Sequence, residues 1–414
     1  MHDILRLSRG GIVRTAFEGR WTVLRHRYKI LLGLTCLVVL LMGVDTGGTS
    51  AQASPREEEG TGLPSLACPP RLQLRIPERC PGVGRGGELV RLARQGIRPT
   101  HPLPTARVDP SFGDLPYGFV RVGDWADLFP SAEEAASGGN PNGRVGPGFV
   151  YLSERGPIYV GDVKVYASES GFIRADQVSE PLKPSTFRGL AFSRTPIGPF
   201  GWVIEGGVCP SSSPGAEPNF SQVCFTKYTI VQIHDTQRAG ERDWYLVGPD
   251  QWLDQRKVAR VDPDPTRPEG VEADRWISVN LFEQTASAYV DGQLVYATLT
   301  STGRYGYWTQ PGLFQVWAKL DRDLMTGGIP GEDGSSFYYL ESVPWVLYFD
   351  KSRALHGTYW HNKFGTTTSR GCVNLSIADA RWFYEFAQEG TWVYVWDPSG
   401  ATPRDPAQYG AGGA

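Results

Sequence analysis

Turn-forming residues cut this chain into short runs, and that pattern constrains the fold more than any other feature. Asp291-Gly292 is typical of a two-residue type I′ hairpin, and it separates two alternating runs at 285–290 and 293–300. The 414 residues include 50 Gly and 32 Pro, and 12% are aromatic. Such a composition disfavours long helices. We therefore expect a mainly β protein.

The overall composition excludes several classes of protein. Hydrophobic residues make up 40% of the chain and charged residues 21%, which argues against disorder, a collagen repeat or a polytopic membrane protein. The 41 Lys and Arg residues are outnumbered by 44 Asp and Glu. No excess positive charge is available to meet phosphates, so nucleic acid is not an expected partner.

The N-terminal segment 1–53 has the pattern of an export signal. An apolar run at 30–44 follows a basic stretch and precedes Ala51-Gln52-Ala53, a small-residue cleavage pattern. The run is short for a membrane span but suits the core of a signal peptide. An uncleaved membrane anchor with a basic flank is the alternative. Either interpretation places the rest of the chain, which is acidic, outside the cytoplasm, with membrane contact only through this segment.

Composition shifts divide the remaining chain into four parts. Residues 54–115 are rich in Pro, Gly and Arg and are expected to be a spacer, with a short helix at 88–95. Residues 116–268 show short β-runs, 269–398 form a second β domain, and 399–414 are expected to be a flexible tail. Phe172-Ile173 with Val178 and Trp252-Leu253 with Val258 share a spacing that resembles SH3-like modules. Ordinary β-strands are the alternative.

The second β domain has readable elements. Strands are expected at 276–282, 285–290, 293–300, 313–320, 345–349 and 391–396. The Gly-rich stretch 321–336 is expected to be a mobile lid. Ser376 can cap a helix, with Asp379 at the third position, and Gly390 is expected to end it.

The cysteines point to an oxidising compartment and to one thiol of special interest. Cys36 lies in the apolar run, and five cysteines remain. Two pairs are disulfide candidates, Cys68 with Cys80 and Cys209 with Cys224. Cys372 is left single, so it is either a buried inert thiol or a reactive one.

The surroundings of Cys372 favour chemistry. The thiol follows Gly371 just before a helix start, where backbone N–H groups can lower its pKa and stabilise an oxyanion. His356 lies upstream and can act as its base if the chain folds back. His361 is a rival base that is nearer in the sequence, and core packing of both residue types is the alternative.

The segment resembles the catalytic motif of the L,D-transpeptidases, whose catalytic domain is called YkuD-like. In that motif an upstream His precedes a Ser/Thr-His-Gly-Cys-hydrophobic-Asn run. Here the run is Ser369-Arg370-Gly371-Cys372-Val373-Asn374, and His356-Gly357 provides the upstream His. Arg370 replaces the second His of the family, which leaves nucleophile and base in place. The resemblance covers about residues 274–397 and implies a β-sandwich with one main helix after the nucleophile.

The resemblance also implies a mechanism. Cys372 would attack the third residue of a peptidoglycan tetrapeptide stem, release D-Ala and form a thioester that an amine of a second stem resolves as a 3→3 cross-link. His356 would be the general base and acid, the Gly357 carbonyl would orient it, and the Gly371 amide would help to bind the oxyanion. Carbapenem-type β-lactams would inhibit such an enzyme, and the resemblance implies no cofactor or metal. The implied substrate-binding residues are Ser369, Arg370, Asn374, Met325, Tyr339 and Trp360.

Other functions fit the sequence less well or share the same site. A zinc peptidase is disfavoured, because the four histidines beyond the export signal lack a His-Glu-x-x-His or comparable spacing. A non-catalytic wall-binding protein with a decayed Cys domain is a second alternative. L,D-carboxypeptidase activity, or anchoring of a wall protein through its amine, would use the same site, since the motif does not encode the acceptor.

Overall fold

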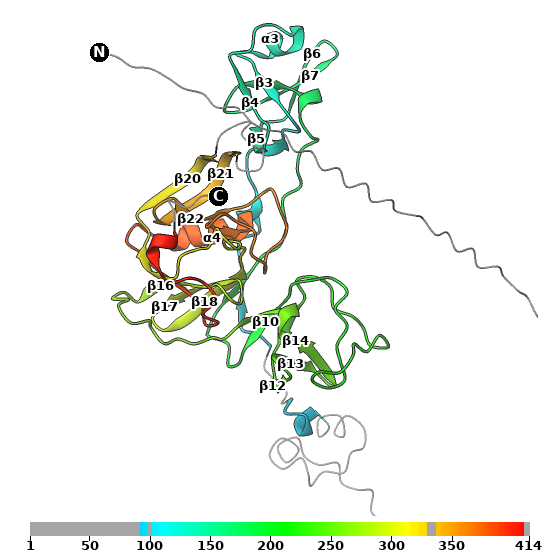
Figure 1. The fold of residues 1–414 in the computed structure, drawn as a ribbon, viewed down its shortest axis with the longest axis vertical. Coiled ribbons are helices and arrows are strands. Elements are labelled where there is room, and N and C mark those ends of the chain that lie inside the picture. Colours follow the sequence, from blue (N-terminus) through cyan, green and yellow to red (C-terminus); the bar gives the residue numbers. More distant parts are fainter. Residues whose placement is uncertain (1–91, 98–101, 329–336, 410–414) are drawn as a thin grey trace, which may run out of the picture. The chain divides into compact units, whose positions relative to one another are not determined.

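The computed structural model describes residues 92–97, 102–328 and 337–409, and this part of the chain is mainly β (Figure 1). The mainly β fold expected from the turn pattern is confirmed. The largest sheet has the strand order β1-β9-β18-β17-β16-β24-β19. Its strands are β1 (Thr105–Ala106), β9 (Leu190–Phe192), β16 (Arg275–Asn280), β17 (Thr285–Val290), β18 (Gln293–Leu299), β19 (Gly312–Gln315) and β24 (Trp392–Trp396).

The predicted hairpin forms the centre of this sheet. β17 and β18 pair in antiparallel fashion, and Asp291 and Gly292 between them have φ values of 50° and 70°. Two consecutive positive φ values are what a type I′ turn requires, which is why the second position is a glycine. The hairpin fixes the register that sends Ala286 and Ala288 into the core.

A second sheet, next to which Cys372 lies, has the order β2-β5-β21-β22-β23, with β20 paired to β21. Its strands are β2 (Gly118–Arg121), β5 (Phe149–Glu154), β20 (Ala318–Gly327), β21 (Tyr338–Asp350), β22 (Arg353–Gly357) and β23 (Val373–Leu375). The main core lies between the two sheets, where Ile277 and Val279 of β16 join Leu347, Leu355 and Val373 in one apolar cluster. These two sheets therefore form a β-sandwich.

Helix α4 (Ile377–Phe386) follows β23 directly and covers the core. Ser376 accepts a hydrogen bond from the Asp379 N–H at 3.1 Å, as the capping pattern predicts. Phe383 of this helix is fully buried, a placement that contributes about 1.5–3 kcal/mol. The helix ends at Phe386 and not at Gly390, which has a φ of 86° in the turn before β24.

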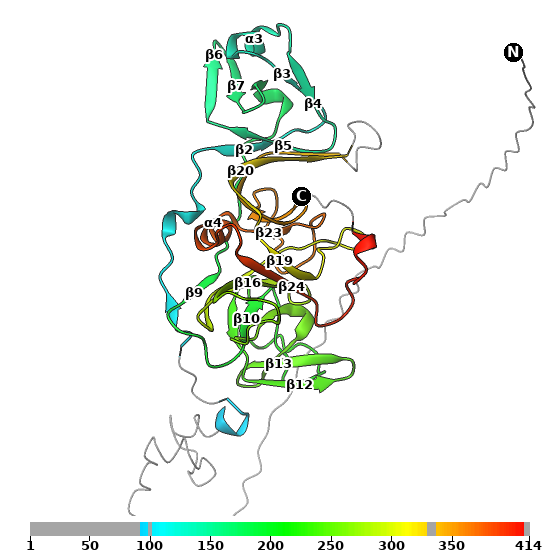
Figure 2. The same ribbon diagram turned by 90° about the vertical axis from the view of Figure 1, so that its left-hand side faces the viewer.

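The expectation of a lid at 321–336 is wrong in part, because β20 and β21 form a hairpin there. The loop expected at 321–336 is strand as far as Gly327, and β21 begins at Tyr338 and not near residue 345. Charged residues 321–323 suggest a loop, yet they suit an exposed strand at the margin of a sheet. The strand extends because the first residues of β21 also pair in parallel with β5 (Figure 2).

The region 116–268 contains two meanders of the same element order. The first is β6 (Pro157–Val160), β7 (Val163–Ala167) and β8 (Phe172–Arg174), followed by the short 3₁₀-helix η3 (Ala175–Gln177). The second is β12 (Asp235–Ala239), β13 (Arg242–Gly248) and β14 (Gln251–Asp254), followed by η4 (Gln255–Lys257). The repeated spacing therefore marks a repeated order of elements, and an SH3-like identity of these modules remains a prediction.

The other elements complete these modules. Near the first meander lie β3 (Ala126–Leu128), α3 (Ala132–Ser137) and β4 (Gly143–Val145). Near the second, β10 (Phe200–Val203) pairs with β11 (Ile230–Gln232) and β15 (Val258–Val261). The predicted disulfide between Cys209 and Cys224 is formed.

Strands are shared across the boundaries expected from composition. β1 and the 3₁₀-helix η2 (Pro110–Gly113) belong to the expected spacer, yet β1 extends the large sheet and Arg381 of α4 donates to the Ser111 carbonyl. β9 comes from the middle region and pairs with β18. In the expected tail, η5 (Pro406–Gln408) leads to Tyr409, which is buried.

Some of the expectations fall on residues that the structure does not describe. These are the export signal with Cys36, the Cys68–Cys80 pair and most of the spacer. In the ranges that are described, none of the helices has the length and apolar character needed to cross a membrane.

We predict that Asp379 anchors helix α4 to the sandwich. Its buried carboxylate accepts from the Gly189 N–H at 2.8 Å, the Tyr296 hydroxyl at 2.7 Å and the Thr298 hydroxyl at 2.6 Å. Asp379→Ala leaves three buried donors unsatisfied, so it should lower the free energy of unfolding by about 3 kcal/mol or more. Asp379→Asn, which keeps an acceptor, should cost less.

Urea unfolding followed by tryptophan fluorescence measures these changes. Asp162→Ala, at an exposed loop position, is the matched control and should change stability by less than about 0.5 kcal/mol. A loss below about 1 kcal/mol for Asp379→Ala would contradict the anchoring role.

Candidate active site

Parallel pairing of β22 with β23 brings the two ends of the motif together. Leu355 lies opposite Val373 and His356 lies opposite Asn374. Continuing this register places Cys372, one position before β23, next to Ala354. Because paired residues share a face and alternate residues return to it, Cys372, Asn374 and His356 all face the same side.

Cys372 is a free thiol that is fully buried. Its Sγ lies 3.7 Å from the Ser352 carbonyl oxygen. Burial raises the pKa of the thiol to about 12, an effect that the backbone of Ala354 and the Arg353 guanidinium partly oppose. The resting side chain is therefore the neutral thiol and not a thiolate.

His356 is also fully buried, and one neighbour fixes its tautomer. Its Nδ1 lies 3.1 Å from the Gly357 carbonyl oxygen, which can only accept, so Nδ1 carries the proton. Nε2 therefore carries the lone pair, and it has no hydrogen-bond partner in the described part of the chain although it is buried. Burial lowers the pKa of His356 to about 4, so the imidazole is a neutral base.

Glycine is required at two positions of this site. A Cβ on Gly357 would lie 2.8 Å from Pro344 Cγ, so the close approach of β22 to β21 needs the missing side chain. Gly371 has a φ of 123°, a conformation that L side chains rarely adopt, and a Cβ there would lie 3.0 Å from Arg353 Nε.

The loop before Cys372 is held by hydrogen bonds, one of them from a distant segment. Ser369 Oγ donates to the Cys372 carbonyl at 2.6 Å and accepts from the Gly371 N–H at 3.1 Å. Thr309 Oγ1 donates to the Gly371 carbonyl at 2.8 Å. The Gly371 N–H is thus engaged by Ser369, and its expected part in binding an oxyanion stays a prediction. The Cys372 N–H, in contrast, donates to no acceptor within the described ranges.

His361 occupies a different place from that of a base. Its Nδ1 accepts from the Lys363 N–H at 3.2 Å, which puts the proton on Nε2. Nε2 lies 3.2 Å from Thr368 Oγ1 and 3.1 Å from the amide group of Asn374. Turning that amide so that Oδ1 faces the Nε2 proton also satisfies Oδ1, which is otherwise buried without a partner among the described residues. His361 thus holds Asn374 beside His356.

The expected substrate-binding residues divide into two groups. Ser369, Arg370, Asn374 and Trp360 lie around the cysteine loop, where the Trp360 ring is 5.7 Å from that of His356. Arg370 lies over the Tyr338 ring at 4.8 Å. Met325 instead packs with Phe119 and Leu340, and the Tyr339 hydroxyl lies 2.7 Å from Ser170 Oγ. Tyr339 thus contacts the first meander, whereas Met325 packs among residues of β2, β5 and β21.

Three residues that sequence reasoning missed support the site. Arg353 is buried, pairs with Asp350 at 2.8 Å and lies 5.4 Å from the centre of the Tyr409 ring. Thr309 and Tyr409 are distant in sequence from the motif, and no local pattern marks either of them. Within residues 92–97, 102–328 and 337–409, no group of three or more His, Cys, Asp and Glu is arranged to hold a metal ion.

Comparison with known proteins finds a family for part of the chain. Residues 274–395 match the YkuD family, described as the L,D-transpeptidase catalytic domain. YciB of Bacillus subtilis (strain 168), a candidate L,D-transpeptidase by its name, is 29% identical over 160 residues, which are 34% of this chain and 79% of that protein. L,D-transpeptidase 2 of Mycobacterium tuberculosis (strain CDC 1551 / Oshkosh) is 29% identical over 119 residues, 27% of this chain and 29% of that one.

Solved structures include similar chains. The catalytic domain of the E. faecium L,D-transpeptidase acylated by ertapenem is 26% identical, with a TM-score of 0.27. The match covers 31% of this chain and all of that domain.

We predict that the buried histidines make stability fall in acid. The pKa of His356 and of His361 is lowered to about 4, whereas an unfolded histidine has a pKa near 6.5. Between about pH 6.5 and 4 the unfolded chain therefore binds more protons, and the stability present above this window is lost as the pH falls through it. His356→Gln should flatten the pH dependence by up to about 1.4 kcal/mol per pH unit.

Urea unfolding at pH 5, 6 and 7 gives this slope. His234→Gln is the comparison variant, because burial also lowers the pKa of the half-buried His234 but less strongly. An unchanged slope for His356→Gln would show that His356 is not neutral in the folded state.

Proposed function

We propose that this chain, whose residues 274–395 form an L,D-transpeptidase catalytic domain of the YkuD family, is a cysteine-dependent peptidoglycan L,D-transpeptidase. The observation that carries the proposal is the free thiol of Cys372 on the same face as an imidazole whose Nε2 lone pair has no other partner in the described chain. A nucleophile, a base and a group that orients the base are the parts that acyl transfer needs.

In the first step His356 Nε2 takes the thiol proton as Cys372 Sγ attacks the carbonyl of the third stem residue. The tetrahedral intermediate collapses, the C–N bond to the terminal D-Ala breaks, and the proton passes from His356 to the leaving amine. A thioester between Cys372 and the donor stem remains. Because burial disfavours both the thiolate and the imidazolium, proton transfer accompanies the attack and does not precede it.

The N–H of Cys372 is the oxyanion donor that the geometry favours. The Gly371 N–H is held by Ser369 Oγ, so the loop directs one donor and not two towards the developing charge. One such donor contributes about 3 kcal/mol in comparable sites. Ser369 and Thr309 then act by keeping the loop rigid.

In the second step an amine of an acceptor stem attacks the thioester. His356 takes the proton from this amine and returns it to the sulfur as the thiol leaves, which gives a 3→3 cross-link and the free enzyme. Water as acceptor would make the protein an L,D-carboxypeptidase, and an amine of a protein would anchor that protein to the wall. A carbapenem would acylate Cys372 because its lactam carbonyl is a strained acyl donor.

We also propose that the protein works outside the cytoplasm. The formed disulfide between Cys209 and Cys224 supports an oxidising compartment, in agreement with the export pattern of residues 1–53. Cleavage of that segment and its retention as an anchor are both compatible with this location.

We predict a covalent adduct on Cys372. Residues 54–414 are incubated with a disaccharide-tetrapeptide or with a carbapenem, and the intact mass is measured for the wild type and for Cys372→Ala. The wild type should gain the mass of the acyl group, release D-Ala and form a cross-linked product. The variant, shown to be folded by circular dichroism, should do none of these.

Absence of both adduct and D-Ala release from folded wild-type protein would refute the transpeptidase. A non-catalytic wall-binding protein would then be the better description, and retention on insoluble peptidoglycan would test it.

We predict that the two nearby histidines differ in their effect on acylation. His356→Gln removes the base and should slow acylation by a carbapenem by about 10²-fold or more. His361→Gln can still reach Asn374, so it should slow acylation by less than tenfold. Stopped-flow fluorescence measures both rates, and equal losses, or a larger loss for His361→Gln, would reverse the assignment of the base.

A further inference from the structure

The outer face of the large sheet carries an unusual set of side chains. In β16 and β17 the inward positions are apolar, whereas Ser278, Asn280, Thr285 and Ser287 point outwards. The pairing places Ser278 between Ser287 and Tyr394, and Asn280 between Thr285 and Trp396. A solvated sheet face usually carries polar side chains and a covered face apolar ones. This face combines the two, because the hydroxyl groups of Thr285 and Ser287 are buried beside aromatic rings.

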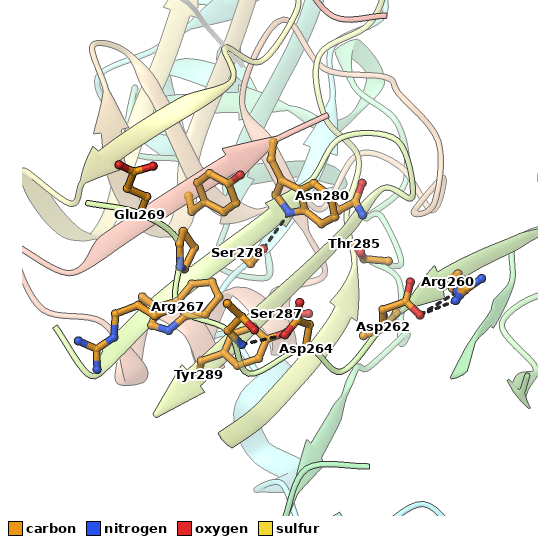
Figure 3. A pocket seen from close by; sticks show the side chains of 16 residues that line it. Arg260, Asp262, Asp264, Arg267, Glu269, Ser278, Asn280, Thr285, Ser287 and Tyr289 are labelled. Atoms are coloured by element: carbon orange, nitrogen blue, oxygen red, sulfur yellow. Dashed lines mark hydrogen bonds and ion pairs between the residues drawn. The ribbon is translucent and has the colours of Figure 1, made fainter. Parts of the chain in front are cut away.

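A pocket lies over this face. The segment 260–269 forms its wall, and its volume is about 610 Å³, within the range of about 300–1,000 Å³ that holds small ligands (Figure 3). Tyr394 and Trp396 are half-buried, with ring planes 8° apart and centres separated by 6.3 Å. The two rings thus offer nearly parallel planes at neighbouring outward positions of β24.

Hydrogen-bonding groups of fixed direction line the same pocket. Asn280 Oδ1 accepts from the N–H groups of Phe282 and Glu283 at 3.0 and 3.1 Å, which leaves its NH₂ group as a donor. The Ser278 oxygen accepts from Trp396 Nε1 at 3.0 Å, so its own proton can be given to another acceptor. The Asn280 amide and the Ser278 hydroxyl are therefore preorganised as donors, because the oxygen atom of each already accepts a hydrogen bond from the protein.

The wall supplies acceptors and excess negative charge. Arg260 pairs with Asp262, and Arg267 pairs with Asp274. Asp264 and Glu269 form no ion pair in the described part of the chain. The pKa of Asp264 is lowered by hydrogen bonds from Thr266, so this carboxylate is ionised. A phosphate or a carboxylated ligand would be repelled, whereas a ligand rich in hydroxyl groups would find acceptors.

We propose that this pocket binds a neutral saccharide chain. The C–H faces of pyranose rings carry slight positive charge and match the faces of Tyr394 and Trp396, and sugar hydroxyls match the carboxylates and the Asn280 amide. The identity of the sugar as wall glycan rests on the proposed function, since the stem peptides are carried on glycan. The site is distinct from the cysteine, which lies beside the other sheet of the sandwich.

Binding is tested on the full chain carrying Cys372→Ala, purified in a non-ionic detergent that has no sugar headgroup. The probes are chitotetraose, maltotetraose and tetragalacturonate, and calorimetry gives the affinity. At least one neutral tetrasaccharide should bind, and the anionic one should not. Failure of both neutral sugars to bind, or a preference for tetragalacturonate, would overturn the proposal.

Variants locate the site. Trp396→Ala and Glu269→Gln should each weaken binding at least tenfold, and Trp396→Phe, which keeps an aromatic face, should restore most of it. Tyr305→Ala removes an aromatic ring that is 88% exposed and lies outside the pocket, so it should leave affinity unchanged. If Trp396→Ala fails to fold, the sugar affinity of Glu269→Gln tests the site instead. Equal sugar affinities of Glu269→Gln and Tyr305→Ala would show that the sugar binds elsewhere.

A kinetic comparison separates this proposal from the proposed function. With Cys372 intact, Trp396→Ala should raise KM for stem-bearing polymeric glycan several-fold and leave KM for the free tetrapeptide unchanged. Sugar binding without any acylation of Cys372 would refute the enzyme and leave the saccharide site standing. Acylation of Cys372 without sugar binding would refute the saccharide site and leave the proposed enzyme standing.

Discussion

The parallel pairing of β22 with β23 is the contact on which the rest of the site depends. Parallel strands need a connection that crosses over, and here the segment 358–372 makes it without a helix. The crossover keeps its shape because a distant segment holds it: Ser301 exchanges backbone hydrogen bonds with Asn374, and Thr309 holds the Gly371 carbonyl. The position of the thiol is thus set by the first half of the domain as much as by its own motif.

Burial determines the charge states of Cys372 and His356. An exposed cysteine beside a histidine can form an ion pair and react with any electrophile. Here desolvation disfavours both charged forms, so the resting pair is neutral. Arg353 sits behind the loop, held by Asp350 and covered by Tyr409, and it lowers the thiol pKa only in part. In the proposed mechanism, a substrate would have to bring its carbonyl to this buried thiol before the proton moves, which would favour selectivity.

Local signals in the sequence were sufficient for local structure. The Asp291-Gly292 turn, the Ser376 cap and the Cys209–Cys224 pair each depend on residues close in the chain, and all three are present in the structure. Long-range pairing leaves no such signal. Part of the segment expected to be a lid is strand, because β21 pairs with β5. This pairing joins segments that lie far apart in the chain. The engagement of the Gly371 N–H by Ser369 likewise depends on a backbone conformation that no residue pattern specifies.

The sharing of strands has a mechanical consequence. Glu341 of β21 is buried and accepts from the Ser153 N–H at 2.7 Å and from the hydroxyl groups of Ser153 and Ser170. The first meander is therefore bound to the hairpin of β20 and β21. The chain continues from β21 into β22, which carries His356. Moving the hairpin alone would leave this carboxylate buried without donors, a cost of several kcal/mol. Any movement of the β20–β21 hairpin must therefore carry the first meander with it.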